Sequence, residues 1–76
     1  MTSEHMYKVI ELVGTSSESW EKAAVAAVEG AASHLKDLRI GEVTQLDMQV
    51  SEGKVVAYRA KVKVSFKYHP ELHEKA

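Results

Sequence analysis

The segment 55–68 alternates apolar and polar side chains, and this pattern constrains the fold more than any other part of the chain. Apolar residues take every second position: Val56, Tyr58, Ala60, Val62, Val64, Phe66 and Tyr68. A period of two predicts a β-strand with one buried and one solvent-exposed face. The segment is longer than a usual strand of about five or six residues, so it needs a long partner and a cover. Because the chain offers one candidate helix as that cover, the pattern already suggests an assembly.

The N-terminal half predicts a strand followed by a helix. The apolar, β-branched run 6–13 is typical of a strand, which Gly14 is expected to end. The segment 15–18 has the spacing of a capping box, so a helix is expected from about Ser16 to about Leu35. Its alanine-rich stripe, which can lie close to a sheet, is expected to contain Trp20, Ala24, Ala27, Val28, Ala31 and Leu35. We interpret Trp20 as a core anchor and not as a ligand platform.

The C-terminal half predicts a hairpin. A second strand is expected over residues 40–51, followed by a turn at 52–54 with Gly53 at its tip. A β-bulge after Val43 would place the expected inner residues of this second strand on one face. These residues are Val43, Leu46, Met48 and Val50. Pro70 is expected to end the long strand. The element order is therefore β-α-β-β, an α+β fold in a single domain, 1–76, with 1–5 and 69–76 as loose tails.

Size and composition limit the kinds of protein that this chain can be. A domain of 76 residues buries only about 60% of its unfolded surface, so it needs additional stabilisation. The chain has no cysteine, which excludes disulfides, and no apolar run approaches the roughly 20 residues of a membrane span. Ten Lys and Arg nearly balance eleven Asp and Glu, so no nucleic-acid partner is expected. We expect a cytoplasmic protein, without a membrane partner, that is stabilised by oligomerisation, a ligand or a metal.

The run Glu11-Leu12-Val13-Gly14-Thr15-Ser16, followed by a helix of small residues, resembles the dodecin family. The resemblance extends from about Tyr7 to Lys67 and includes the Gly53 turn and the strand 58–66. It implies a three-stranded antiparallel sheet wrapped around one helix, with twelve copies closed into a hollow shell of tetrahedral symmetry. Such a homododecamer would supply the missing cover for the long strand.

Two positions depart from the family's flavin pocket. Flavin-binding dodecins stack paired flavins between tryptophans, and the resemblance places that tryptophan at Ile40 and a flavin-contacting glutamine at Arg59. Ile40 has no π face. Arg59 offers no hydrogen-bond acceptor and carries a fixed positive charge, although it can bind a phosphate or carboxylate. The resemblance therefore assigns Ile40, Glu42, Gln45 and Arg59 to the ligand pocket, but these two substitutions argue against flavin in its usual mode.

Several segments are closer to the calcium-binding dodecin-like subgroup, which also lacks the flavin tryptophan. They are Ser19-Trp20-Glu21, Asp37-Leu38-Arg39-Ile40, Gln45-Leu46-Asp47-Met48 and Tyr58-Arg59 with Val64-Ser65-Phe66-Lys67. This resemblance implies the same shell with calcium, or another ligand, in place of flavin. Oxygen donors suit calcium, and one carboxylate near a threefold axis becomes three ligands. Glu42 and Asp47 are therefore the candidate metal ligands, and a solvated strand face is the alternative.

The residues also leave other functions open. Positive side chains occur along the long strand at Arg59, Lys61, Lys63 and Lys67. They are interpreted either as the lining of an anion site or pore, or as a solvated face that discourages aggregation. A different class of function is an enzyme subunit that acts on a small anion at Arg59, with Glu42 as its base and cross-strand partner. A third possible function is a structural container without a specific ligand. His69 and His73 have metal-site spacing, although a loose tail is favoured. Since no catalytic constellation is present, a non-catalytic ligand-binding or storage protein is the preferred hypothesis.

Overall fold

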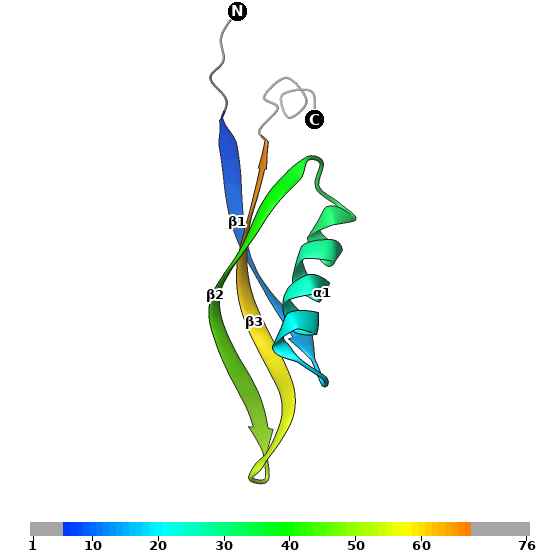
Figure 1. The fold of residues 1–76 in the computed structure, drawn as a ribbon, viewed down its shortest axis with the longest axis vertical. Helices are drawn as coiled ribbons and strands as arrows, with labels where there is room; N and C mark the ends of the chain where they lie inside the picture. Colours follow the sequence, from blue (N-terminus) through cyan, green and yellow to red (C-terminus); the bar gives the residue numbers. More distant parts are fainter. Residues whose placement is uncertain (1–5, 68–76) are drawn as a thin grey trace, which may run out of the picture.

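The computed structural model describes residues 6–67, which form four elements. Strand β1 spans Tyr7–Ser16, helix α1 spans Trp20–Ala32, strand β2 spans Leu38–Ser51 and strand β3 spans Lys54–Lys67. The strands form one antiparallel sheet in the order β1-β3-β2, so the long strand is paired on both sides (Figure 1). The predicted β-α-β-β order and three-stranded sheet are confirmed. The expected strand end at Pro70 and the expected tails lie outside the described residues.

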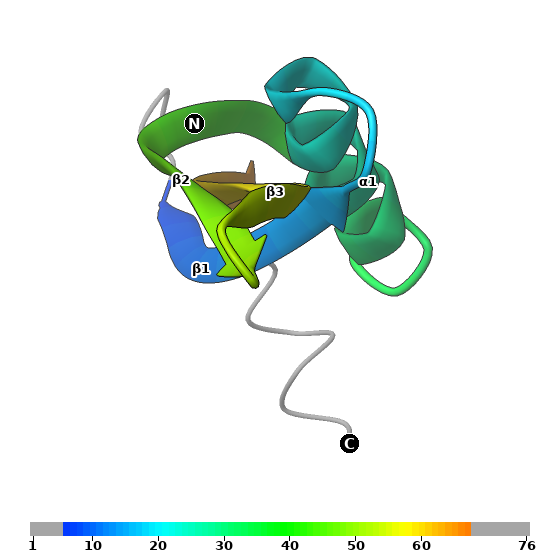
Figure 2. The ribbon, with the colours of Figure 1, turned by 90° about the horizontal axis from the view of Figure 1, so that it is seen from below.

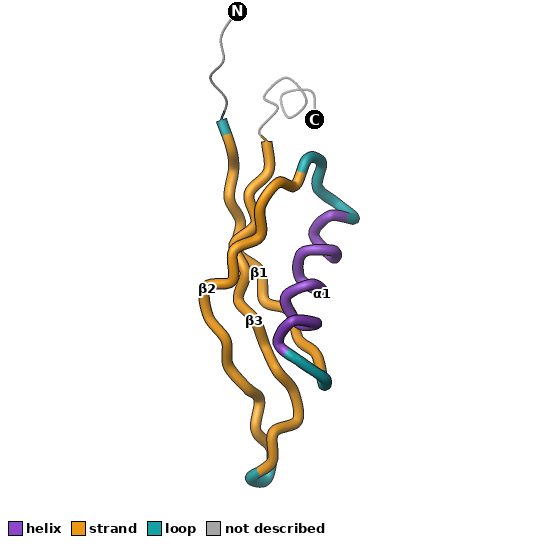
Figure 3. The backbone as a smooth tube through the Cα atoms, in the orientation of Figure 1, coloured by secondary structure: helices purple, strands orange, loops and turns teal. Residues whose placement is uncertain are grey.

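The helix covers one part of one face of the sheet. It packs mainly against β1 and β3 and touches β2 only slightly (Figure 2). The β2–β3 hairpin extends well past the N-terminal end of α1 (Figure 3). The sheet therefore has a covered half and an uncovered half.

The core is small and lies between the helix and β3. Its members are Ala23, Ala27, Ala31, Ala60, Val62, Val64 and Phe66. The predicted inner face of the long strand is thus confirmed from Ala60 to Phe66, whereas Val56 is 46% exposed because it lies in the uncovered hairpin. The helix stripe was predicted without Ala23, which is fully buried, while Ala24 is only partly buried.

Gly14 does not end β1, so that prediction is wrong. The strand continues for two more residues, and Gly14 pairs with Ala60 beneath the helix. A Cβ atom at position 14 would lie 2.0 Å from the carbonyl oxygen of Ala23. The missing side chain therefore lets the helix backbone approach the strand closely, a role of glycine that competes with its role as a strand breaker. The predicted close contact between helix and sheet is confirmed.

The helix begins later than predicted, because the segment 15–18 does not act as its capping box. Ser19 is the N-cap: its backbone is extended, and its hydroxyl oxygen accepts a bond from the amide of Lys22 at 3.0 Å. The hydroxyl oxygen of Ser16 instead accepts bonds from two backbone amides of the β1–α1 turn, at 3.0 and 3.4 Å. The helix consequently spans Trp20–Ala32 and ends three residues before the predicted Leu35.

The predicted bulge in β2 is confirmed. The register shifts between Val43 and Gln45, which leaves Thr44 as the extra residue. The Thr44 hydroxyl donates a hydrogen bond to the carbonyl oxygen of Lys61 at 3.2 Å. The bulge places Val43 and Leu46 on the same face of the sheet, as the sequence pattern required.

The predicted β2–β3 turn is confirmed as well. Glu52 and Gly53 have positive φ values of 52° and 78°. Two consecutive positive φ values are typical of a type I′ turn, whose twist matches that of a two-stranded ribbon. Gly53 adopts this conformation without steric cost, and β3 begins at the next residue, Lys54.

The predicted inner residues of β2 are not buried in the single chain, so the prediction is wrong for one isolated copy. Val43, Leu46, Met48 and Val50 are 48%, 49%, 47% and 61% exposed, respectively. The first three lie opposite Val62, Ala60 and Tyr58, so they belong to the helix side of the sheet. They remain exposed because α1 lies over β1 and β3. Among the described elements, an apolar surface of β2 is thus left without a cover.

Candidate functional site

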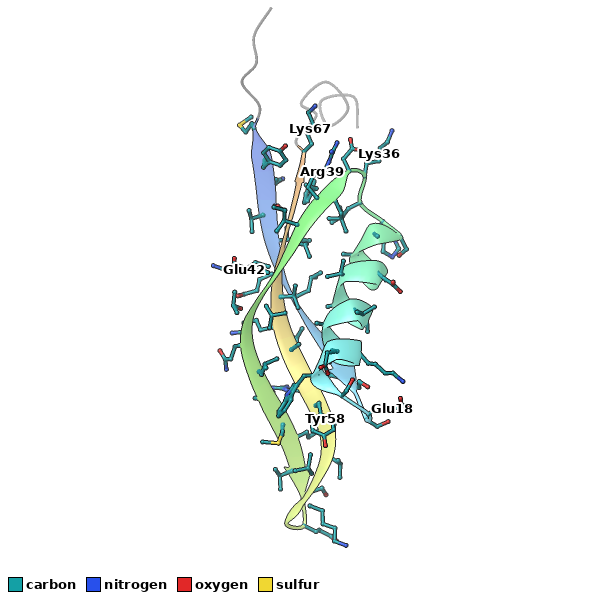
Figure 4. The ribbon with its side chains drawn as sticks, viewed as in Figure 1. Glu18, Lys36, Arg39, Glu42, Tyr58 and Lys67 are labelled. Carbon is teal, nitrogen blue, oxygen red and sulfur yellow. The ribbon has the colours of Figure 1, made fainter. Side chains whose placement is uncertain are left out.

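The predicted site residues share the face of the sheet that points away from α1. Alternation along β3 sets this face, because Val62 and Val64 are buried under the helix and their neighbours point the other way. In the same register, residues of β2 lie opposite these neighbours in the pairs Ile40–Ser65, Glu42–Lys63, Gln45–Lys61 and Asp47–Arg59. Figure 4 shows Glu42 on the side of the sheet opposite the helix. We refer to this side as the outer face.

Within one chain, these residues are spread along the outer face and do not form a pocket. Ile40 lies opposite Ser65, which is six positions from Arg59 on β3, a separation of about 20 Å at roughly 3.3 Å per residue. Ile40 is 64% exposed, and Glu42 is exposed as well. The structure therefore brings Asp47 and Arg59 together but leaves Ile40 and Glu42 apart from them.

Asp47 and Arg59 form a bidentate ion pair. Nε of Arg59 donates to Oδ1 of Asp47 at 2.7 Å, and Nη2 donates to Oδ2 at 2.9 Å. This fork geometry is the strong arrangement between a guanidinium and a carboxylate. The hydrogen bond from Arg59 is the main reason why the pKa of Asp47 lies below its ordinary value of 3.8; partial desolvation opposes the shift, and the charges of Arg59 and Lys61 add to it. The same hydrogen bond raises the pKa of Arg59.

Trp20 holds the other side of Asp47. Its indole Nε1 donates a hydrogen bond to the backbone carbonyl oxygen of Asp47 at 3.0 Å. Its ring meets Tyr58 edge to face, with ring centroids 5.1 Å apart and an interplanar angle of 69°, and Figure 4 shows Tyr58 close to the first turn of α1. Trp20 is thus an anchor of the helix on the β2–β3 hairpin. The sequence signal for this contact is the indole N–H group of Trp20, because a buried indole N–H usually donates a hydrogen bond to an acceptor.

The predicted contact between Glu42 and Arg59 is wrong. Glu42 lies opposite Lys63, four positions along β3 from Arg59, a distance of about 13 Å along the strand. Within residues 6–67, the side chain of Glu42 forms no hydrogen bond or ion pair. An enzyme that uses Arg59 to bind an anion would therefore lack Glu42 as its base in the same chain. Asp47, the carboxylate that does lie beside Arg59, is a weak base because its pKa is lowered.

The described residues of one chain, 6–67, do not supply a closed calcium site. Among residues 6–67, no three His, Cys, Asp or Glu side chains lie close enough together to hold a metal ion. Calcium takes six to eight oxygen ligands, and both carboxylate oxygens of Asp47 already accept bonds from Arg59. Of the two predicted metal ligands, Glu42 is available and Asp47 is engaged. The pair His69 and His73 lies outside the described residues.

An apolar groove lies on the helix side of the sheet, between α1 and β2. It encloses about 520 Å³ and is lined by Trp20, Glu21, Ala24, Val25, Val43 and Leu46. A neighbouring depression of about 310 Å³ shares Ala24, Val25 and Val43 with it. Sequence reasoning missed the groove, because Val25 falls outside the alanine stripe. Its signal was an apolar residue on the polar side of a helix.

The family and its members were identified by comparison with known proteins. The family model described as Dodecin matches residues 6–69. The calcium dodecin of Mycobacterium tuberculosis is 45% identical over 65 residues, which are 86% of this chain and 92% of that protein. Its crystal structure, described as calcium chelating with a novel calcium-binding site, has a TM-score of 0.77 at 47% identity and covers 86% of this chain and 93% of that chain.

A second relative leads to the same family. The dodecin of Streptomyces coelicolor has a TM-score of 0.83 at 35% identity, covering 90% of this chain and 97% of that chain. Among residues 6–67, no helix is both long and apolar enough to cross a membrane. The family match and the two relatives show that this chain belongs to the dodecin family.

Proposed function

We propose that the protein is a non-catalytic, dodecameric calcium-binding protein of the cytoplasm, and that residues 1–76 form a single domain in each copy. The observation that carries this proposal is the uncovered apolar half of the sheet. Val43, Leu46 and Met48 lie on the helix side, are about half exposed, and have no cover within the described chain. A small soluble protein rarely leaves such a surface open unless another molecule packs on it.

The assembly is supported by the size of the core. Val62 and Val64 are the largest fully buried side chains of the described residues, so one chain buries little apolar area. A domain of this size commonly gains its remaining stability from oligomerisation. The number twelve and the closed shell follow from membership of the dodecin family. The groove between α1 and β2 is the surface that would be covered in the assembly.

Calcium is supported by the similarity to calcium dodecin and by the state of Glu42. This carboxylate is exposed and has no partner among residues 6–67. Because residues 6–67 hold no cluster of metal ligands, we infer that Glu42 side chains of several copies converge near a symmetry axis. Asp47 is not included, since Arg59 engages both of its oxygens. Flavin is not proposed, because the exposed aliphatic side chain of Ile40 has no π face to stack on.

Native mass spectrometry and calcium titration test this proposal together. We expect a mass of twelve chains, and we expect the melting temperature to rise as calcium is added, because a ligand bound only by the folded state stabilises it. Glu42→Gln should remove the calcium response while leaving the mass unchanged. Glu52→Gln removes an exposed carboxylate at the hairpin turn and serves as the matched control. A monomeric mass would reject the assembly, and a melting temperature that is insensitive to calcium would reject the ligand.

A further inference from the structure

The ion pair between Asp47 and Arg59 has no role in the proposed calcium site, yet it is a bidentate polar contact of the outer face. The guanidinium group has five N–H donors, and Asp47 accepts two of their bonds, at 2.7 and 2.9 Å. The side chains of Arg59 and Asp47 are 46% and 39% exposed. The pair is therefore accessible to a dissolved ligand, and three of the donors of Arg59 are not used by Asp47.

The charges around this pair favour an anion. Lys61 follows Arg59 on the same face of β3, and the direct neighbours of these two cations are Thr15, Val13 and Gln45 in addition to Asp47. Two cations and one carboxylate leave this end of the outer face with a net charge of +1. The end near Glu42 differs, because there a single cation, Lys63, lies between two carboxylates, Glu11 and Glu42. The two ends of the face thus suit ligands of opposite charge.

We propose that Arg59 is a binding site for small oxyanions, such as a carboxylate or phosphate group, and that Asp47 masks this site by acting as an internal anion. A ligand of this class presents two oxygen acceptors to the guanidinium fork, as the Asp47 carboxylate does now. When such a ligand binds, its oxyanion group takes the place of the Asp47 carboxylate on the guanidinium group of Arg59. The proposal rests on contacts within one chain and is independent of calcium.

Two features allow the mask to open without disturbing the fold. An exposed ion pair contributes little to stability, because water and salt screen it. In addition, Trp20 holds Asp47 through the backbone carbonyl and not through the carboxylate. The Asp47 side chain can therefore rotate away from Arg59 while β2, the bulge and the indole contact stay in place.

Trp20 also provides the readout, since it is the only tryptophan of the chain and contacts both Asp47 and Tyr58. We would titrate the assembled protein with inorganic phosphate at constant ionic strength, in buffer passed over a chelating resin, and follow indole fluorescence. Wild type should bind phosphate, Arg59→Gln should lose binding, and Asp47→Asn should bind about two- to fivefold more tightly, which is the range that an exposed ion pair contributes. Acetate, titrated in the same way, distinguishes carboxylate from phosphate ligands.

The controls remove the same charges elsewhere. Glu52→Gln matches Asp47→Asn, and Lys54→Gln matches Arg59→Gln; both control positions are exposed at the hairpin turn. If Asp47→Asn bound phosphate no more tightly than wild type, Asp47 would orient Arg59 or be irrelevant to it, and the mask would be rejected. If Arg59→Gln bound phosphate as wild type does, the site itself would be rejected. Should Asp47→Asn fail to fold, Asp47→Ser makes the same comparison.

Discussion

The covered and uncovered halves of the sheet have the same kind of sequence pattern but differ in burial. Under the helix, Val62 and Val64 of β3 are completely buried. On the same side of the sheet, Leu46 and Met48 of β2 follow an equally regular pattern and remain about half exposed. The difference teaches that alternation specifies which face of a strand is apolar, whereas burial depends on what lies above it. For β2, that cover has to come from outside the described chain.

The covered half should be broken most severely at Gly14. Gly14→Ala would place a Cβ atom 2.0 Å from the carbonyl oxygen of Ala23, so the helix backbone must move away from β1. We expect the free energy of unfolding to fall by about 3 kcal/mol or more, at the upper end for overpacked cores. Urea denaturation at fixed protein concentration measures this. Gly30→Ala is the matched control, because a Cβ atom there meets nothing within 4 Å; equal effects at both positions would contradict the close-contact argument.

The uncovered half should be broken by a charge on its apolar side. Leu46→Asp places a carboxylate beside Val43 and Trp20, in the groove that we propose is covered by another copy. We expect the assembly to dissociate, because a buried unpaired charge is strongly unfavourable, and light scattering measures the mass. Gln49→Asp adds the same charge to the outer face of β2 and should leave the mass unchanged. A stable shell in Leu46→Asp would mean that the groove is open in the assembly.

A smaller effect is expected from a cavity in the covered half. Val62→Ala removes two methyl groups from a side chain that is fully buried, and such a change costs about 2 kcal/mol in the free energy of unfolding. Val13→Ala is the control: Val13 belongs to the same half but is 54% exposed, so its truncation should change stability by less than about 0.5 kcal/mol. The comparison fails if the two variants unfold at the same urea concentration.

The smallest effect concerns the ion pair and its dependence on pH. Because Arg59 lowers the pKa of Asp47 in the folded state below 3.8, the pair stabilises the fold above that pH. Its contribution disappears as the pH falls through the lowered pKa. Melting curves should show wild type slightly more stable than Arg59→Gln near pH 6, with the difference lost as the pH falls below 3.8 through the lowered pKa of Asp47. A difference that persists in acid would have to come from packing of the Arg59 side chain.

Local sequence patterns predicted the parts of the fold that depend on local physics. The alternation of β3, the turn at Gly53 and the bulge after Val43 each have a cause within a few residues of the chain. Two local interpretations were wrong. Gly14 was taken as the end of β1, because nothing in that short motif reveals that Ala23 packs against the strand. Ser16 was taken as the start of the helix, because the spacing of residues 15–18 fits a capping box as well as Ser19 fits an N-cap. Tertiary contact decided the role of Gly14, whereas a local cap at Ser19 set the start of the helix.

The candidate site was predicted less completely, because cross-strand partners depend on register. Arg59 was predicted to pair with Glu42 across the strands, whereas it pairs with Asp47. The register of the hairpin shifts both near the turn, between Gln49 and Val50, and again at the bulge. A count from the Ser51–Lys54 pair places Leu46 opposite Arg59, and the shift between Gln49 and Val50 moves this partner to Asp47. The neighbour of Arg59 therefore had to come from the structure.

The pairing of Tyr7 with Lys67 has a consequence for the connectivity of the fold. These residues begin β1 and end β3, and they lie directly opposite each other, at the roughly 5 Å spacing of adjacent strands. A short linker could therefore join them and make the polypeptide circular, with all strand pairs kept. Reopening such a ring within the Glu52–Gly53 turn would give a rearranged chain in which β3 comes first and β2 last. The architecture is thus defined by its neighbours in space and not by its order of synthesis.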